Sequence, residues 1–233
     1  ALKVKNENEF ILDRSESYIG VMIDDLITKG VSEPYRMFTS RAEYRLSLRA
    51  DNADQRLTPF GIKINLVKKI REEKFIDKQR KLIQVTDALK NNLISPNVAA
   101  KHSIKIAMDG IKRSGLEVLS LKNVNLNKLR TIWANIPQYG ASIDKQVEIE
   151  AHYSGYLIRQ SHDIKAFKKD EGILIPEGIK YDSFSGLSNE IKSKLKKIKP
   201  KTLGQALRID GVTPAAAIIL LGYIKKSKIR KSA

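Results

Sequence analysis

The sequence has no cysteine, only three histidines and a single tryptophan among its 233 residues. The lack of cysteine excludes a disulfide scaffold, a cysteine-ligated zinc site and a cysteine nucleophile. His152 and His162 lie too far apart on one expected helix to share a metal ion, so we predict no metal site. No apolar run reaches the roughly 18 to 20 residues that cross a bilayer. The first ten residues are too polar for a signal peptide, which predicts a soluble, cytoplasmic protein without a membrane partner.

The sequence also lacks the short motifs that carry most recognisable chemistry. It contains no G-x-G-x-x-G, no G-x-x-x-x-G-K-[ST], no H-E-x-x-H and no G-x-S-x-G. These motifs bind nucleotide phosphates, hold a catalytic zinc ion or present a serine nucleophile. We therefore predict no catalytic and no cofactor-binding residue in this chain, and expect its role to be binding.

What the sequence has in excess is positive charge. Lysine and arginine number 43 against 26 aspartates and glutamates, which gives a formal net charge of +17. Hydrophobic residues make up 42% and charged residues 30%, a balance typical of a globular protein. The surplus favours a polyanionic partner, since each neutralised phosphate releases counterions. A general compositional bias toward lysine would explain part of it.

The arginines concentrate in residues 30–57, where aromatic residues accompany them. The pattern Ser-Arg-Ala-Glu at 40–43 predicts a capping box and a helix beginning there. Such a helix would put Arg41, Arg45 and Arg49 on one face. Guanidinium groups beside aromatic rings suit planar contacts to phosphates and stacking on bases. Ion pairing of the same arginines with neighbouring carboxylates explains the pattern equally well, and the residues alone leave both interpretations open.

The apolar periodicity predicts a mostly α fold. It consists of a multi-helical body followed by an extended connection and a small C-terminal unit of three helices. Trp133 is interpreted as a core residue. Asp24 and Asp25 are adjacent and point about 100° apart on a helix, so we interpret them as surface or interdomain charges rather than an ion site. The expected helices of the body cover residues 15–29, 66–94, 116–121, 126–136 and 143–167.

The three C-terminal helices carry a second group of candidate binding residues. Thr202 starts the second of these helices, Thr213 is a good N-cap of the third, and Pro214 is well placed at its first position. The turn before Thr213 is similar to that of a helix-hairpin-helix, whose free backbone amides can hold a phosphate. Such residues are also common in the turns of other αα-hairpins. Most of the apolar residues of this unit are interpreted as core. They are Leu203, Ala206, Ile209, Val212 and Ile218.

Longer stretches resemble a known family. EPYRMFTSRAEYRL followed by DNADQRLTPFG is similar to the C-terminal region of the glucose-inhibited division protein A family, GidA, also called MnmG. The resemblance extends upstream through DRSESYIGVMIDDLITKG and downstream through YSGYLIRQ, IPEGIKY, GLSNEIKSKL and TLGQALRIDGVTPAAA. It covers nearly the whole chain, although residues 68–135 match mainly in helical pattern.

The resemblance implies the FAD- and NADH-dependent subunit of an enzyme that modifies the wobble uridine of certain tRNAs. FAD would bind an α/β domain that is missing from this chain, so the fragment alone would be no enzyme. The intact protein would be a homodimer with tRNA and the GTPase MnmE as partners. Residues 1–14 would be the tail of the FAD-binding domain, 15–172 a helical domain with an arginine-rich segment facing tRNA, and 173–233 a helical subdomain for partner docking.

The residues and the resemblance together give two sets of expected site residues. Expected at the tRNA are Arg36, Arg45, Arg41, Arg49, Tyr35, Lys196, Lys197 and Lys199. Expected at the GTPase partner are the five apolar residues of the C-terminal unit given above. The alternative function is a stand-alone helical module that binds DNA or RNA through a helix-hairpin-helix-like C-terminus.

Overall fold

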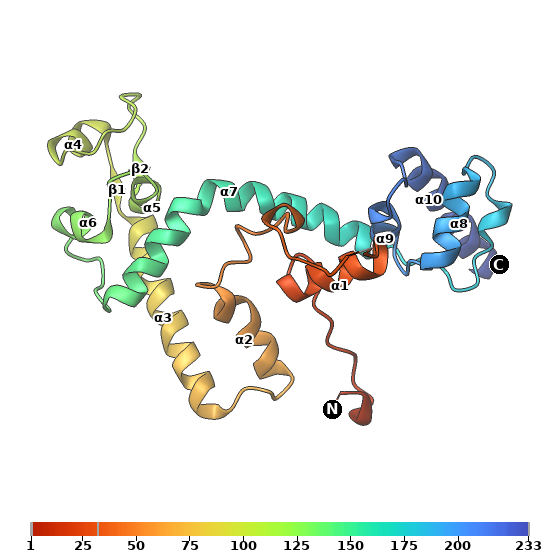
Figure 1. Cartoon of the computed structure of the whole chain (residues 1–233). Helices are drawn as coiled ribbons and strands as arrows, with labels where there is room; N and C mark the ends of the chain where they lie inside the picture. Colours follow the sequence, from red (N-terminus) through yellow and green to blue (C-terminus); the bar gives the residue numbers. More distant parts are fainter. Residues whose placement is uncertain (1, 32, 233) are drawn as a thin grey trace. The chain divides into compact units, whose positions relative to one another are not determined.

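The computed structural model describes residues 2–31 and 33–232 and confirms the mostly α fold (Figure 1). Its only sheet, within the residues described, is an antiparallel pair of two-residue strands, in which Leu93 lies opposite Ser114. In chain order the elements are η1 Lys3–Lys5, α1 Tyr18–Thr28, η2 Thr39–Arg41, α2 Ala53–Lys63, α3 Lys69–Asn91, β1 Leu93–Ile94, α4 Pro96–Lys101, β2 Arg113–Ser114, α5 Gly115–Leu119, α6 Leu126–Ile132, α7 Ala141–Glu171, η3 Tyr181–Ser183, α8 Asn189–Ile198, α9 Leu203–Arg208 and α10 Pro214–Ser232.

The chain forms two compact units. The middle unit comprises residues 46–159, and the terminal unit comprises residues 3–45 together with 160–233. Helix α7 contributes its first part to the middle unit and its last part to the terminal unit. The subdomain boundaries expected from the sequence, at residues 14 and 172, stay a prediction.

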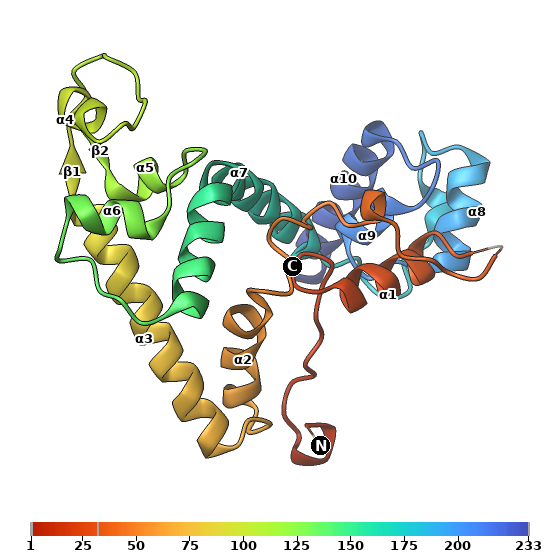
Figure 2. The ribbon, with the colours of Figure 1, turned by 60° about the vertical axis from the view of Figure 1, so that its left-hand side comes forward.

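The core of the middle unit is built by the long helices that periodicity predicted. Leu82, Val85 and Leu89 on α3 are buried against α5, α6 and the start of α7. Each such side chain contributes about 1.5 to 3 kcal/mol by leaving water. Trp133 packs on this cluster, which confirms its assignment to the core. Helix α2 lies beside α3 (Figure 2). The prediction that α3 reaches residue 94 is wrong, because Leu93 has left the helix to pair in β1.

The C-terminal part of the terminal unit has its own core, formed by α8, α9 and α10 around Phe184. The Phe184 ring stacks on Tyr223 with 3.9 Å between centroids and an interplanar angle of 8°. The Thr202 hydroxyl accepts a hydrogen bond from the Gln205 amide and caps α9, so this helix starts where it was predicted to start. Thr213 caps α10 in the same way. The predicted three-helix unit is therefore present, and local capping signals define its helix starts.

Helix α1 exposes several apolar side chains and buries two charged ones, unlike the usual amphipathic helix. Its apolar residues Ile19, Ile23 and Leu26 are exposed, whereas Asp24 and Asp25 are buried. Of the two alternatives for these aspartates, surface charge is therefore wrong, and interdomain charge stays a prediction. Arginine side chains from distant parts of the chain reach them, as described below. An apolar stripe normally faces a core, but on α1 charge pairing determines the buried side.

Two classes of feature are missing from the described ranges. No helix there has the length and apolarity needed to cross a membrane. No cluster of three or more histidines or carboxylates is arranged there to hold a metal ion.

Candidate nucleic-acid interface

The arginine-rich segment does not form the predicted helix. Residues 39–41 make a single 3-10 turn, non-helical turns follow, and α2 begins only at Ala53. The predicted capping box at Ser40 is wrong. The Glu43 carboxylate instead accepts two hydrogen bonds from Nη2 of Arg14, at 2.7 and 2.9 Å. A bidentate ion pair with a buried arginine replaces the local cap.

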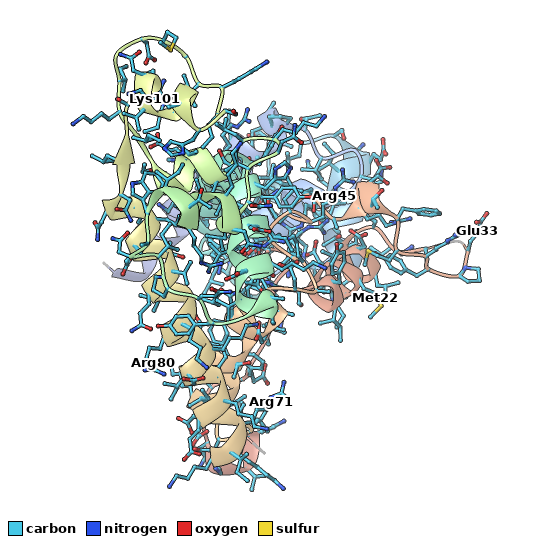
Figure 3. All side chains as sticks on the ribbon, turned by 90° about the vertical axis from the view of Figure 1, so that its left-hand side faces the viewer. Met22, Glu33, Arg45, Arg71, Arg80 and Lys101 are labelled. Atoms are coloured by element: carbon cyan, nitrogen blue, oxygen red, sulfur yellow. The ribbon has the colours of Figure 1, made fainter. Side chains whose placement is uncertain are left out.

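A cavity of about 790 Å³ lies against this segment in the terminal unit. Four cationic side chains and two aromatic rings take part in its lining, with one acidic residue, Glu33. Glu33 lies at the end of the loop that follows α1 (Figure 3). The cavity brings together residues far apart in the sequence, since Lys197 comes from α8. Its lining residues are Lys29, Gly30, Val31, Glu33, Pro34, Tyr35, Arg36, Phe38, Arg41 and Lys197.

The aromatic rings and the arginines of the cavity are paired. The guanidinium carbon of Arg36 lies 5.2 Å from the ring centroid of Phe38. That of Arg41 lies 5.0 Å from the ring centroid of Tyr35. Phe38 remains 49% exposed, so its ring is accessible to a ligand. Cationic groups that reach phosphates, next to rings that stack on bases, are the combination that single-stranded nucleic acid requires.

The four arginines expected at the tRNA have different surroundings. Arg36 and Arg45 are exposed, and neither guanidinium has an ion-pair partner among the residues described. Arg41 is half-buried and pairs with Asp25. Arg49 belongs to the middle unit, where it forms ion pairs with Asp51 and Glu150 and lies over the Tyr153 ring. The guanidinium groups of Arg36 and Arg45 are therefore available for an anionic ligand, whereas that of Arg49 is already held in ion pairs.

Behind the cavity lies a buried charge cluster that sequence reasoning missed. Nη1 of Arg14 donates to Asp24 Oδ2 at 2.5 Å and to Asp25 Oδ1 at 3.1 Å. The other Asp25 oxygen accepts from the Tyr35 hydroxyl at 3.0 Å and from Arg41 Nη1 at 3.3 Å. Arg208 of α9 donates to both oxygens of Asp24, at 2.6 and 2.7 Å.

The charge state of this cluster follows from its contacts. Burial by itself would raise the pKa of the Asp25 carboxyl, but hydrogen bonds from Arg14 and Tyr35 and the charge of Lys29 outweigh it, so the pKa is lowered. Burial and the bond to Asp25 raise the pKa of the Tyr35 hydroxyl. Asp25 is therefore ionised and Tyr35 is a neutral donor at neutral pH.

The three lysines expected at the tRNA lie at or near the end of α8. Lys197 is exposed and lines the cavity of the arginine segment. Lys196 forms an ion pair with Asp182. Lys199 adopts a left-handed conformation with φ of 51° and, together with Lys196, lines a separate cavity of about 520 Å³. Of these three, only Lys197 shares a cavity with Arg36.

The apolar residues expected at the GTPase partner mostly belong to the core of the terminal unit. Leu203, Ala206 and Ile209 are buried, as the core interpretation predicted. Val212 is partly buried and packs against the same core. Ile218 on α10 differs, because 72% of it is exposed.

Comparison with known proteins gives one consistent result. Residues 69–161 match the model of the tRNA modifying enzyme MnmG/GidA C-terminal helical domain, and residues 163–233 match that of the MnmG/GidA C-terminal helical bundle. The tRNA uridine 5-carboxymethylaminomethyl modification enzyme MnmG of Caldicellulosiruptor saccharolyticus is 43% identical over 98% of this chain and 37% of that protein. MnmG of Clostridium kluyveri is 42% identical over 99% of this chain and 37% of its own length.

A solved structure agrees with these relatives. One crystal form of Aquifex aeolicus GidA superimposes with a TM-score of 0.78 at 37% identity, over 96% of this chain and 35% of that one. The two family models and these relatives identify the chain as a C-terminal helical region in a family of tRNA-modifying enzymes. The chain belongs to the MnmG/GidA family. It spans about 37% of the length of the curated relatives it matches.

Proposed function

We propose that this chain is the tRNA-binding and partner-binding region of an FAD-dependent, cytoplasmic enzyme that adds an aminomethyl-type group to carbon 5 of the wobble uridine. The cavity that gathers Arg36, Arg41, Tyr35 and Lys197 carries the proposal. Family membership supports it, since the relatives are named as tRNA uridine modification enzymes. It also disfavours the alternative of a nucleic-acid-binding module unrelated to an enzyme.

The chemistry of the cavity supports tRNA as the ligand. Lys29, Arg36, Arg41 and Lys197 supply positive charge for phosphates, and the exposed Phe38 ring supplies a stacking surface. The chain's net charge of +17 favours approach of a polyanion. Binding of a tRNA transcript, compared with duplex DNA of similar charge, tests the assignment. Preference for tRNA that is lost in Arg36→Ala supports the proposal, and equal binding of both nucleic acids contradicts it.

FAD and NADH are proposed to act outside this chain. The sequence has none of the glycine-rich loops that cradle nucleotide phosphates at a helix N-terminus. We therefore expect the purified chain to stay colourless after incubation with excess FAD and gel filtration. A stoichiometric yellow complex with a flavin spectrum would contradict the assignment. The proposed homodimer likewise concerns the intact protein.

The MnmE-like GTPase is proposed to dock on the exposed side of α10. Ile218 is the one residue of the predicted docking set that is largely exposed, so it offers apolar contact area without unfolding the core. Apolar anchors of this kind carry much of the affinity of protein interfaces.

Ile218→Asp should weaken binding to the GTPase about tenfold or more and leave tRNA affinity unchanged. The substitution places a charge in the proposed contact and leaves the buried side of α10 intact. Pull-down of the GTPase and filter binding of tRNA measure the two affinities. Ile76→Asp is the matched control, because Ile76 is also an exposed isoleucine on a helix, α3 of the middle unit. Equal loss of GTPase binding in both variants would refute the docking site.

A further inference from the structure

We propose that Asp25 is a positioning residue of the cavity: held by the buried Arg14, it fixes Tyr35 and Arg41 in place at the cavity wall. Through Asp24, the same cluster ties this wall to α9. The inference rests on the proposed function, because the cavity is taken to receive tRNA.

Asp25 contacts two of the cavity-lining side chains through one carboxylate oxygen. Oδ2 accepts from the Tyr35 hydroxyl at 3.0 Å and from Arg41 Nη1 at 3.3 Å. Tyr35 and Arg41 are also the two members of one cation–π pair and both line the cavity. Asp25 is itself 0% exposed, so it cannot contact a ligand. Its effect on a ligand therefore passes through the cavity-lining side chains that it contacts, which also include Lys29, whose Nζ lies 3.6 Å from Asp25 Oδ1.

Arg14 holds the cluster from behind. It is 2% exposed, and its guanidinium contacts Asp24, Asp25 and Glu43. Nη2 also donates to the main-chain carbonyl of Arg41 at 3.1 Å. Apart from the short turn η2, residues 33–45 have no regular secondary structure to hold them. Side-chain contacts to Arg14 and Asp25 take over that task, and a preordered wall lowers the entropy cost of binding.

The cluster continues from Asp24 to the C-terminal helices. Arg208, the last residue of α9, donates to both oxygens of Asp24 and pairs with Glu171 at 2.6 Å. Helices α1 and α9 lie next to each other (Figure 1). Arg208 does not line the cavity. The contacts of Asp24, Arg14 and Asp25 therefore give a change at Arg208 a path to the cavity.

The sign of the effect of Asp25→Asn separates positioning from simple electrostatics. The substitution removes one negative charge beside an anion-binding cavity, so charge alone predicts tighter tRNA binding. Positioning predicts weaker binding, roughly fivefold or more, because an asparagine amide cannot accept from Arg14, Arg41 and Tyr35 together. Filter binding at fixed salt measures the change. Affinity equal to or tighter than that of the wild type would overturn the proposal.

A double-mutant cycle measures the coupling between Asp25 and Arg41 in tRNA binding, which a purely structural role of Asp25 would not produce. In the Arg41→Ala background, Asp25→Asn should cost less tRNA affinity than in the wild type, because one of its two targets is absent. Strictly additive losses would overturn the proposal. Tyr35→Phe removes only the hydroxyl that donates to Asp25 and keeps the ring. It should also weaken binding, which covers the case in which Asp25→Asn does not fold.

Two further variants complete the test. Arg130→Gln is the control, because Arg130 forms an ion pair with Asp144, at 2.6 Å, in the middle unit. It should lower the melting temperature and leave tRNA affinity unchanged; a loss of affinity equal to that of Asp25→Asn would overturn the proposal.

Arg36→Ala reports on the proposed function separately. If Arg36→Ala weakens binding while Asp25→Asn does not, positioning fails and the tRNA site stands. If Arg36→Ala binds like the wild type, the proposed site itself fails.

Discussion

Replacing Arg36 or Arg45 with alanine is expected to weaken tRNA binding by roughly five- to a hundredfold, equivalent to about 1 to 3 kcal/mol for a charge-assisted or stacked contact. Both guanidiniums are exposed, and neither has an ion-pair partner in residues 2–31 and 33–232. Their removal therefore breaks no internal ion pair, and stability should change little. Filter binding and thermal melting of the same preparations measure the two quantities.

Two further measurements distinguish a direct phosphate contact by Arg36 or Arg45 from a general effect of their positive charge on tRNA affinity. Lysine at either position should recover only part of the affinity, because an ammonium group cannot make the bidentate fork. The slope of log affinity against log salt should fall by about one unit for each phosphate contact removed. Arg80→Ala is the control. This exposed arginine on α3, labelled in Figure 3, pairs with Asp77 in the middle unit. Wild-type affinity of both test variants, with lower melting temperatures, would make these arginines structural.

Replacing Arg14 with methionine is expected to lower the free energy of unfolding by about 3 kcal/mol at neutral pH. Breaking a buried ion pair typically costs about 3 to 5 kcal/mol, because the remaining charge is left uncompensated. The loss should fall at the low end, since Asp24 retains Arg208 and Asp25 retains Arg41. Urea unfolding measures the change. Arg80→Met, at an exposed ion pair, should cost far less.

The stabilisation by this cluster should also depend on pH. The pKa of Asp25 is lowered in the folded protein, so its contribution is present above the unfolded value of about 3.9 and disappears as the pH falls through the lower folded value. The stability difference between wild type and Arg14→Met should therefore shrink on acidification below about pH 4. A difference that stays constant from neutral pH into that acidic range would contradict the proposed ionic role of Arg14.

Local signals predicted those parts of the fold that depend on neighbouring residues. The N-caps Thr202 and Thr213 and the apolar stripe of α3 involve residues within a few turns of each other. The expected site residues Tyr35, Arg36, Arg41 and Lys197 do share one cavity. Their residue types pointed to phosphate and base contacts, but the proximity of Lys197 to Arg36 arises from the tertiary fold and has no local signature.

Two of the errors share one physical cause, which is charge pairing over long sequence distances. The Ser40 motif predicted a capping box, but Glu43 pairs with Arg14, 29 residues earlier. Asp24 is buried and not a surface charge, because it pairs with Arg208, 184 residues away. Buried carboxylates require such partners, and neither helical periodicity nor capping rules indicate where the partners lie.

Hydrogen–deuterium exchange with and without tRNA tests the central claim most directly, namely that the cavity of the terminal unit is the tRNA interface. With saturating tRNA, amides of residues 33–45 should exchange more slowly, and the protection should disappear in Arg36→Ala at the same tRNA concentration. Unchanged exchange in residues 33–45, with protection confined to other segments such as the lysine-rich α3, would contradict the claim.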